Sequence, residues 1–177
     1  MAATVHAWPI ASDSDAFESL VREHQGMVFS LAYHFLRDRA VAEELSQEVF
    51  LHLYRNAGSI ESAAHLSFWL RKVTSHRCID HARRLRFRPR VGLEHAPEPV
   101  AREAPHDPLL SGLLQKLVAR LPERSRMIVI LRYQEDLEPS EIASLLDVPV
   151  GTVKSNLHRA LAVLRGKLER TTKGVRP

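Results

Sequence analysis

Four polar residues in the last third of the sequence have the types and spacing that DNA recognition requires. Lys154, Ser155, His158 and Arg159 occupy positions i, i+1, i+4 and i+5, so on a helix they would share one face. Lysine and arginine pair with guanine in the major groove, and serine and histidine can reach other base edges. Acidic residues are absent from Val148 to Arg165. The pattern predicts a helix that reads DNA bases.

A helix-turn-helix is predicted to hold these side chains. Pro139 fits the first turn of a leading helix, where its missing N–H is not needed. The apolar pattern breaks at Asp147, which tolerates the left-handed backbone of a sharp turn. A second helix opens at Gly151 and has apolar residues at helical spacing, which predicts one buried stripe: Val153, Leu157, Ala160, Leu161 and Leu164. The second helix of such a motif lies in the major groove.

Amphipathic helices with a basic surface also occur in bundles that bind no DNA, and a charged face is commonly only a solvated one. The short turn, the base-reading residue types and the absence of acids favour DNA binding over that alternative.

Residues 149–160 closely resemble the recognition helix of bacterial sigma factors of the extracytoplasmic-function (ECF) type, whose signature is Gly-Thr-Val-Lys/Arg-Ser-Arg-x-x-Arg-Ala. The sequence departs from it at Asn156, where the family usually has arginine, so one phosphate or base contact is missing or replaced. Asp136 and Asp147 stand where the family often has glycine, and Glu138 stands at the usual serine cap. The resemblance implies contacts to the promoter's −35 element by Thr152, Lys154, Ser155, Asn156, His158 and Arg159.

The composition suits a helical protein with a polyanionic partner. The 177 residues are 45% apolar and 26% charged, and β-branched residues are scattered, so strands are not expected. The net charge is only +4, but five arginines fall within eight residues of the third predicted helix and its end, and a second basic zone spans Lys154 to Lys167. Two basic zones indicate a polyanion that is contacted at two places.

An acidic amphipathic helix is predicted over Ala40–Asn56. Leu45, Val49 and Leu53 form its apolar stripe, which Phe50 and Tyr54 widen. A solvated acidic face is the plain interpretation. Residues 42–50 also resemble the Ala-Glu-Asp-Leu-x-Gln-Glu-Val-Phe signature of sigma domain 2, whose helix docks on a coiled coil of the largest RNA polymerase subunit. The resemblance implies core polymerase contacts by Glu44, Gln47 and Glu48.

A loop over Ala57–His65 and a basic helix over Leu66–Arg88 are expected next. The pattern of the helix resembles the family's Trp-Leu-x-x-Ile-Ala-x-Asn-x-x-x-Asp-x-x-Arg-Arg, with His76 in place of the usual asparagine. In the family the loop forms a pocket for a flipped base of the −10 element. The resemblance and the basic charge together predict −10 DNA contacts by Arg71, Lys72, His76, Arg77, Arg83 and Arg84.

Four prolines and an excess of acids mark Val91–Pro108 as an extended, flexible linker. We therefore expect an all-α fold with two small helical domains: residues 12–90 as sigma domain 2, residues 91–108 as the linker and residues 109–170 as sigma domain 4 with the helix-turn-helix.

Catalytic and cofactor signatures are absent from the sequence. There is no Gly-rich phosphate loop and no Ser-His-Asp or Cys-His arrangement, and the ten histidines lack the spacing of metal ligands. Cys78 is the only cysteine, which excludes an internal disulfide. Met1–Ser14 has neither a basic region nor a long apolar run, so we expect no signal peptide, no membrane contact and a cytoplasmic location.

The sequence thus predicts an alternative sigma factor without enzymatic activity, metal or cofactor. Its expected partners are core RNA polymerase, promoter DNA and, as is usual in the family, an anti-sigma factor. A stand-alone helix-turn-helix regulator that binds a palindromic site is the alternative, and a helical enzyme or metal-binding protein is a remote third.

Overall fold

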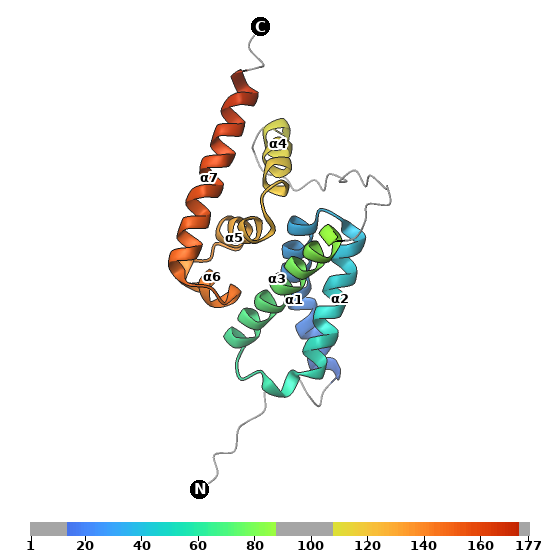
Figure 1. Cartoon of the computed structure of the whole chain (residues 1–177). Helices are drawn as coiled ribbons and strands as arrows, with labels where there is room; N and C mark the ends of the chain where they lie inside the picture. The colour runs from blue at the N-terminus through green and yellow to red at the C-terminus, as the bar shows by residue number, and fades with distance from the viewer. Residues whose placement is uncertain (1–13, 88–107, 174–177) are drawn as a thin grey trace. The chain divides into compact units, whose positions relative to one another are not determined.

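The computed structural model describes residues 14–87 and 108–173, which Figure 1 colours along the chain. Those residues form helices and no strand, which confirms the predicted all-α fold class for the described ranges. The chain divides into two compact units, Met1–Cys78 and Ile79–Pro177, and the division falls inside the third helix. The predicted linker lies outside the described residues except for Pro108, so the domain limits at residues 90 and 109 remain predictions.

A helical hairpin forms most of the first unit. Helix α1 (Ser14–Leu36) and helix α2 (Arg39–Arg55) pack side by side and are joined by a tight turn (Figure 1). Arg37 takes the left-handed backbone at this turn, with φ 59°. Asp38 caps α2, because its Oδ1 accepts the Val41 N–H at 3.1 Å and satisfies one of the donors that a helix start leaves open. The core residues of the hairpin include Val28, Leu31 and Phe35 of α1 and Leu45, Val49 and Leu53 of α2.

The loop between α2 and the next long helix is shorter than the sequence predicted. A 3-10 turn (η2, Ala57–Ser59) is followed by helix α3 (Ala63–Phe87), so the expected start at Leu66 is wrong by three residues. The Ser62 hydroxyl accepts the His65 N–H at 3.1 Å, which caps the helix ahead of the first apolar residue and explains the earlier start. Ile60 is buried and anchors the segment.

The described part of the second unit continues after α3 with α4 (Pro108–Ala119), α5 (Glu123–Tyr133), α6 (Pro139–Leu146) and α7 (Val150–Lys173). Pro108, predicted to end the linker, instead begins α4, because proline suits the first turn of a helix. One core cluster joins α4, α5 and α7 and contains Leu117, Leu121, Val129, Ala160 and Leu164.

Arg126 closes the turn between α4 and α5. Its Nη2 donates to the carbonyl oxygen of Ala119, at the end of α4, and to that of Leu121 at 3.3 Å. The last carbonyls of a helix have no partner within the helix, so the half-buried guanidinium of Arg126 can satisfy them. Arg126 therefore has a structural role, because it holds the turn that contains Leu121 and Pro122.

The turn between α6 and α7 takes the backbone that the sequence predicted. Asp147 ends α6 in the left-handed region with φ 52°, and the Val148 N–H donates to the Ala143 carbonyl at 3.0 Å. At the other end of α6, the Glu141 carboxylate accepts the Glu138 N–H at 2.7 Å, so a glutamate pair replaces the usual serine cap. Asp136, ahead of α6, is also left-handed, with φ 51°.

Replacing Asp147 tests this turn. Asp147→Ala and Asp147→Gly both remove the carboxylate, so a difference between them reports the backbone alone. We expect the glycine variant to be more stable than the alanine variant by about 1 kcal/mol, because only alanine carries a Cβ that opposes the left-handed conformation. Urea unfolding followed by circular dichroism measures the difference. Equal midpoints would contradict the assigned turn.

Cys78 is fully buried in α3, and burial raises the pKa of its thiol to about 12. Since only the thiolate reacts, the thiol should resist a chromogenic disulfide reagent at pH 8 in the folded protein and react once urea unfolds the first unit. The absorbance of the released thiolate measures the rate. Complete reaction within seconds in native buffer would show that Cys78 is accessible and would make it a candidate sensor.

Candidate nucleic-acid interface and docking groove

Helix α7 exposes the four polar residues that the sequence singled out. Lys154, Ser155, His158 and Arg159 are all exposed, whereas Val153 and Ala160 are buried on the opposite side. Two hydrogen bonds along the helix restrict this face: the Ser155 hydroxyl donates to the Gly151 carbonyl, and Arg159 Nε donates to the Ser155 carbonyl at 3.2 Å. The side chains are therefore presented from a rigid helix, as base reading requires.

Two other predicted DNA contacts on α7 are less accessible. Thr152 and Asn156 are half-buried, and Asn156 bonds to Ser125 of α5 at 3.0 Å. The predicted buried stripe is also narrower than expected, because Leu161 is 37% exposed. Each residue turns the helix by about 100°, so Leu161 is rotated out of the contact that buries its neighbour Ala160.

The three predicted polymerase contacts lie on one exposed side of α2. Glu44, Gln47 and Glu48 are exposed, as the spacing i, i+3 and i+4 requires. Glu48 is engaged within the unit, because its Oε2 accepts a charge-assisted hydrogen bond of 2.7 Å from Nη1 of Arg77 on α3. The structure thus joins one residue of the predicted polymerase set to one of the predicted DNA set. Both side chains are partly exposed, so the pair adds at most about 1 kcal/mol to stability.

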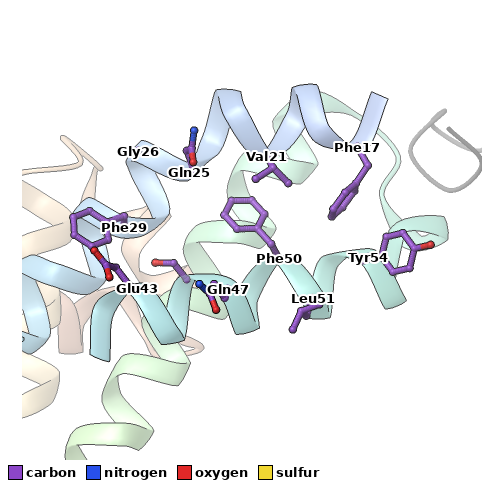
Figure 2. Close-up of a pocket in the computed structure, with 11 residues that line it drawn as sticks. Phe17, Val21, Gln25, Gly26, Phe29, Glu43, Gln47, Phe50, Leu51 and Tyr54 are labelled. Atoms are coloured by element: carbon purple, nitrogen blue, oxygen red, sulfur yellow. The ribbon is translucent and has the colours of Figure 1, made fainter. Parts of the chain in front are cut away.

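An apolar groove of about 870 Å³, which was not predicted from the sequence, runs between α1 and α2. Figure 2 shows Phe17 and Val21 of α1 and Phe50 of α2 pointing toward one another in this groove. Leu51 is 57% exposed, and Tyr54 is 64% exposed, with its ring edge-on to Phe17 at 5.2 Å between centroids. The expectation that Tyr54 widens the core stripe is therefore wrong: it belongs to the surface.

The groove has a polar end. Gln25 of α1 and Glu43 and Gln47 of α2 line it near Phe29, and Figure 2 places Glu43 at the opposite end from Tyr54. Phe50, Leu51, Leu53 and Tyr54 cover more of the α2 circumference than one core stripe needs, and this excess was the sequence signal that could have revealed the groove.

The predicted cations of α3 do not act as one group. Lys72, His76 and Arg83 are spaced by four and seven residues and so follow one face of the helix, whereas Arg77 meets Glu48 on the side of α2. Arg71 is half-buried, and Arg84 is exposed. Arg83 also bonds Asp80 at 3.4 Å. Between α2 and α3, His52 and Trp69 stack with centroids 5.3 Å apart and fix the helix just after the 57–62 segment.

Within residues 14–87 and 108–173, no group of three or more histidine, cysteine or acidic side chains could hold a metal ion. The helices described in the same ranges include none that is long and apolar enough to cross a membrane.

Two protein families match this chain in succession. The sigma-70 region 2 family matches residues 20–88, and the sigma-70 region 4 family matches residues 111–164. The first match contains α2, α3 and all but the first six residues of α1, and the second contains α5, α6 and the part of α7 that carries Lys154 and Arg159.

Similarity to named proteins extends over nearly the whole chain. The ECF RNA polymerase sigma factor SigW of Bacillus subtilis is 30% identical over 169 residues, which are 88% of this chain and 90% of that protein. The ECF RNA polymerase sigma factor SigM of Mycobacterium tuberculosis is 31% identical over 166 residues, 94% of this chain and 84% of the relative.

A solved structure shares the fold. The sigma factor RpoE from Bartonella quintana, determined in complex with the anti-sigma factor NepR, matches with a TM-score of 0.69 at 18% identity, over 88% of this chain and 98% of that one. Both region families, in the expected order, and relatives that are covered almost end to end lead to one conclusion: this chain belongs to the ECF group of sigma-70 RNA polymerase sigma factors.

Proposed function

We propose that this sigma factor docks on core RNA polymerase through α2 and the adjoining groove, and that α3 and α7 direct the enzyme to promoters at the −10 and −35 elements. The proposal is carried by two different exposed surfaces. Exposed acids lie on α2 beside an apolar groove shared with α1, and exposed cations of the types that read bases lie on α7. Membership of the ECF group supports it, since sigma factors confer promoter choice on a shared polymerase.

The groove suits a helical partner. An apolar floor with a polar end accommodates an amphipathic helix, whose apolar residues enter the groove while its charged residues meet the rim. Gln47 and Glu43 line the groove, and Glu44 and Glu48 lie on the same helix. A coiled coil of the largest polymerase subunit with basic residues beside its apolar seam has the required chemistry.

The −10 element is assigned to α3 and the segment before it. Lys72, His76 and Arg83 share one face, on which successive phosphates or exposed bases of one strand could be held. Arg71 and Arg84 flank that face. We assign Arg77 first to holding Glu48 in place, because of their 2.7 Å bond, and only second to DNA.

Control by an anti-sigma factor is part of the proposal. The sigma factor RpoE of Bartonella quintana was solved with its anti-sigma factor bound, and this chain shares its fold. We propose further that the chain has no catalytic activity, because the polymerase it recruits supplies the chemistry, and that it works in the cytoplasm, where that polymerase transcribes.

Pull-down of core RNA polymerase by the tagged full chain tests the docking surface. We expect near-stoichiometric recovery by the wild type and more than tenfold weaker binding by Glu44→Ala/Gln47→Ala/Glu48→Ala, because α2 then loses two exposed acids and the amide of Gln47. Leu51→Glu should weaken binding as strongly by placing a charge on the groove. Glu18→Ala/Glu23→Ala, which removes exposed acids of α1 that do not line the groove, should bind like the wild type.

Two results would count against this assignment. Equal binding by all variants would remove α2 as the anchor. No recovery of polymerase by the wild type, with inhibitor excluded, would favour a stand-alone DNA-binding regulator.

Arg159→Ala tests the assignment of the −35 element. Loss of one good base contact costs about 1–3 kcal/mol of discrimination, so the variant holoenzyme should choose poorly between promoters while still binding core polymerase. In vitro transcription from competing promoter templates measures this choice. Arg165→Ala, an exposed arginine almost two turns further along α7, is the matched control. Unchanged promoter choice by Arg159→Ala would refute the assignment.

A further inference from the structure

One side chain of α7 is held by another helix of the same unit. Ser125, in the first turn of α5, donates its hydroxyl to Oδ1 of Asn156 at 3.0 Å. Asn156 in turn donates from Nδ2 to the Thr152 carbonyl at 2.8 Å, and both Ser125 and Asn156 are half-buried. The amide therefore links α5 to the first turns of the helix that carries the base-reading residues.

The chemistry of the partners fixes the direction of this link. The Thr152 carbonyl can only accept, so the amide nitrogen of Asn156 must face it. The amide oxygen is then left for the Ser125 hydroxyl. An arginine, the usual residue of the family at this position, has donors only and could not accept the Ser125 bond through its side chain in the same way.

The link lies where it can control rotation of α7. Asn156 falls between the buried residues Val153 and Ala160 on one side and the exposed Ser155 and Arg159 on the other. Apolar burial holds α7 against α5 but is non-directional, so it tolerates small rotations of the helix. A hydrogen bond loses strength when its angle or length changes, so the Ser125–Asn156 pair favours one rotation.

We propose that Asn156 is a positioning residue, which bonds Ser125 to set the rotation of α7 on α5 and so aims Lys154, Ser155, His158 and Arg159 at the bases. Asn156 stands where the family usually has arginine, so this chain has the Ser125–Asn156 hydrogen bond in place of a cation at that position. This inference rests on the proposed reading of the −35 element by α7.

Promoter selection by the holoenzyme tests the pair. Core polymerase loaded with each full-length variant selects templates from a library with a randomised −35 element, and sequencing gives the base preference at every position. Ser125→Ala and Asn156→Ala should each lower discrimination about threefold or more at several positions together, and the double variant should be no worse than either single one, because both remove the same link. Ser125→Thr keeps the hydroxyl and should retain the wild-type preference.

Ser144→Ala is the matched control, because it removes an exposed hydroxyl that bonds only within α6. Melting curves by circular dichroism establish that each variant is folded, and retention of preference by Ser125→Thr separates loss of the bond from general damage.

Several outcomes would overturn the proposal. If Ser125→Ala selects like the wild type while Asn156→Ala loses preference at a single base pair, Asn156 reads that base directly. Additive losses in the double variant would show that the two residues act separately. If Arg159→Ala also leaves the preference unchanged, the assignment of α7 to the −35 element has failed, and this outcome is distinct from failure of the pair alone.

Asn156→Arg supplies a second measurement, the salt dependence of DNA binding. A substitution at a residue with a purely structural role would not change it. The added cation should make one more phosphate contact. The slope of log K against the logarithm of the salt concentration, where K is the association constant of the holoenzyme for promoter DNA, should then steepen by about 0.9. The base preference should broaden as in Asn156→Ala. A steeper slope with an unchanged preference would overturn the proposal, because α7 would then keep its aim without the Ser125 bond.

Discussion

Burial of a narrow stripe on α7 is the constraint on which the exposed polar face of this helix depends. Val153, Ala160 and Leu164 are almost completely buried, and the last two belong to the cluster shared with α4 and α5. Because a helix is rigid over these few turns, burying one side decides which residues the other side presents. Arg126 holds α4 to α5 at their turn, and Asp147 turns the chain from α6 into α7, so both stabilise the platform against which the stripe is buried.

The hairpin of α1 and α2 in the first unit differs from this arrangement, because it leaves apolar surface exposed. Its core is complete on one side, with Leu31, Phe35 and Leu53 fully buried. On the other side Leu51 and Tyr54 remain exposed along a groove. Uncovered apolar surface is unfavourable in water and becomes favourable when a partner covers it, at roughly 25 cal/mol per Å². A hairpin with an exposed apolar groove is therefore suited to a partner that must bind and later be released.

The residues predicted to contact polymerase and those predicted to contact DNA differ in charge. The predicted polymerase contacts on α2 include the acids Glu44 and Glu48, whereas the predicted DNA contacts on α3 and α7 include cations, although the whole chain carries only +4. The Glu48–Arg77 bond joins an acid of α2 to a cation of α3. It fixes the position of Glu48 on α2 from a helix that also carries the predicted −10 DNA contacts, so one hydrogen-bonded ion pair links the two predicted surfaces.

Local and periodic features were determined by the sequence alone: the helical class, the helix-turn-helix, the left-handed turn at Asp147 and the exposed positions of Lys154 and Arg159. These depend on interactions within a few residues, and the chain itself records that spacing. The tertiary structure decided what periodicity leaves open. It exposed Leu161 and Tyr54, which had been assigned to buried stripes, and it created the groove from the faces of two helices. It also joined Asn156 to Ser125 and Glu48 to Arg77, which are 31 and 29 residues apart. A helical pattern shows which residues share a face, but only packing between elements decides which neighbour that face meets and how much of it is covered.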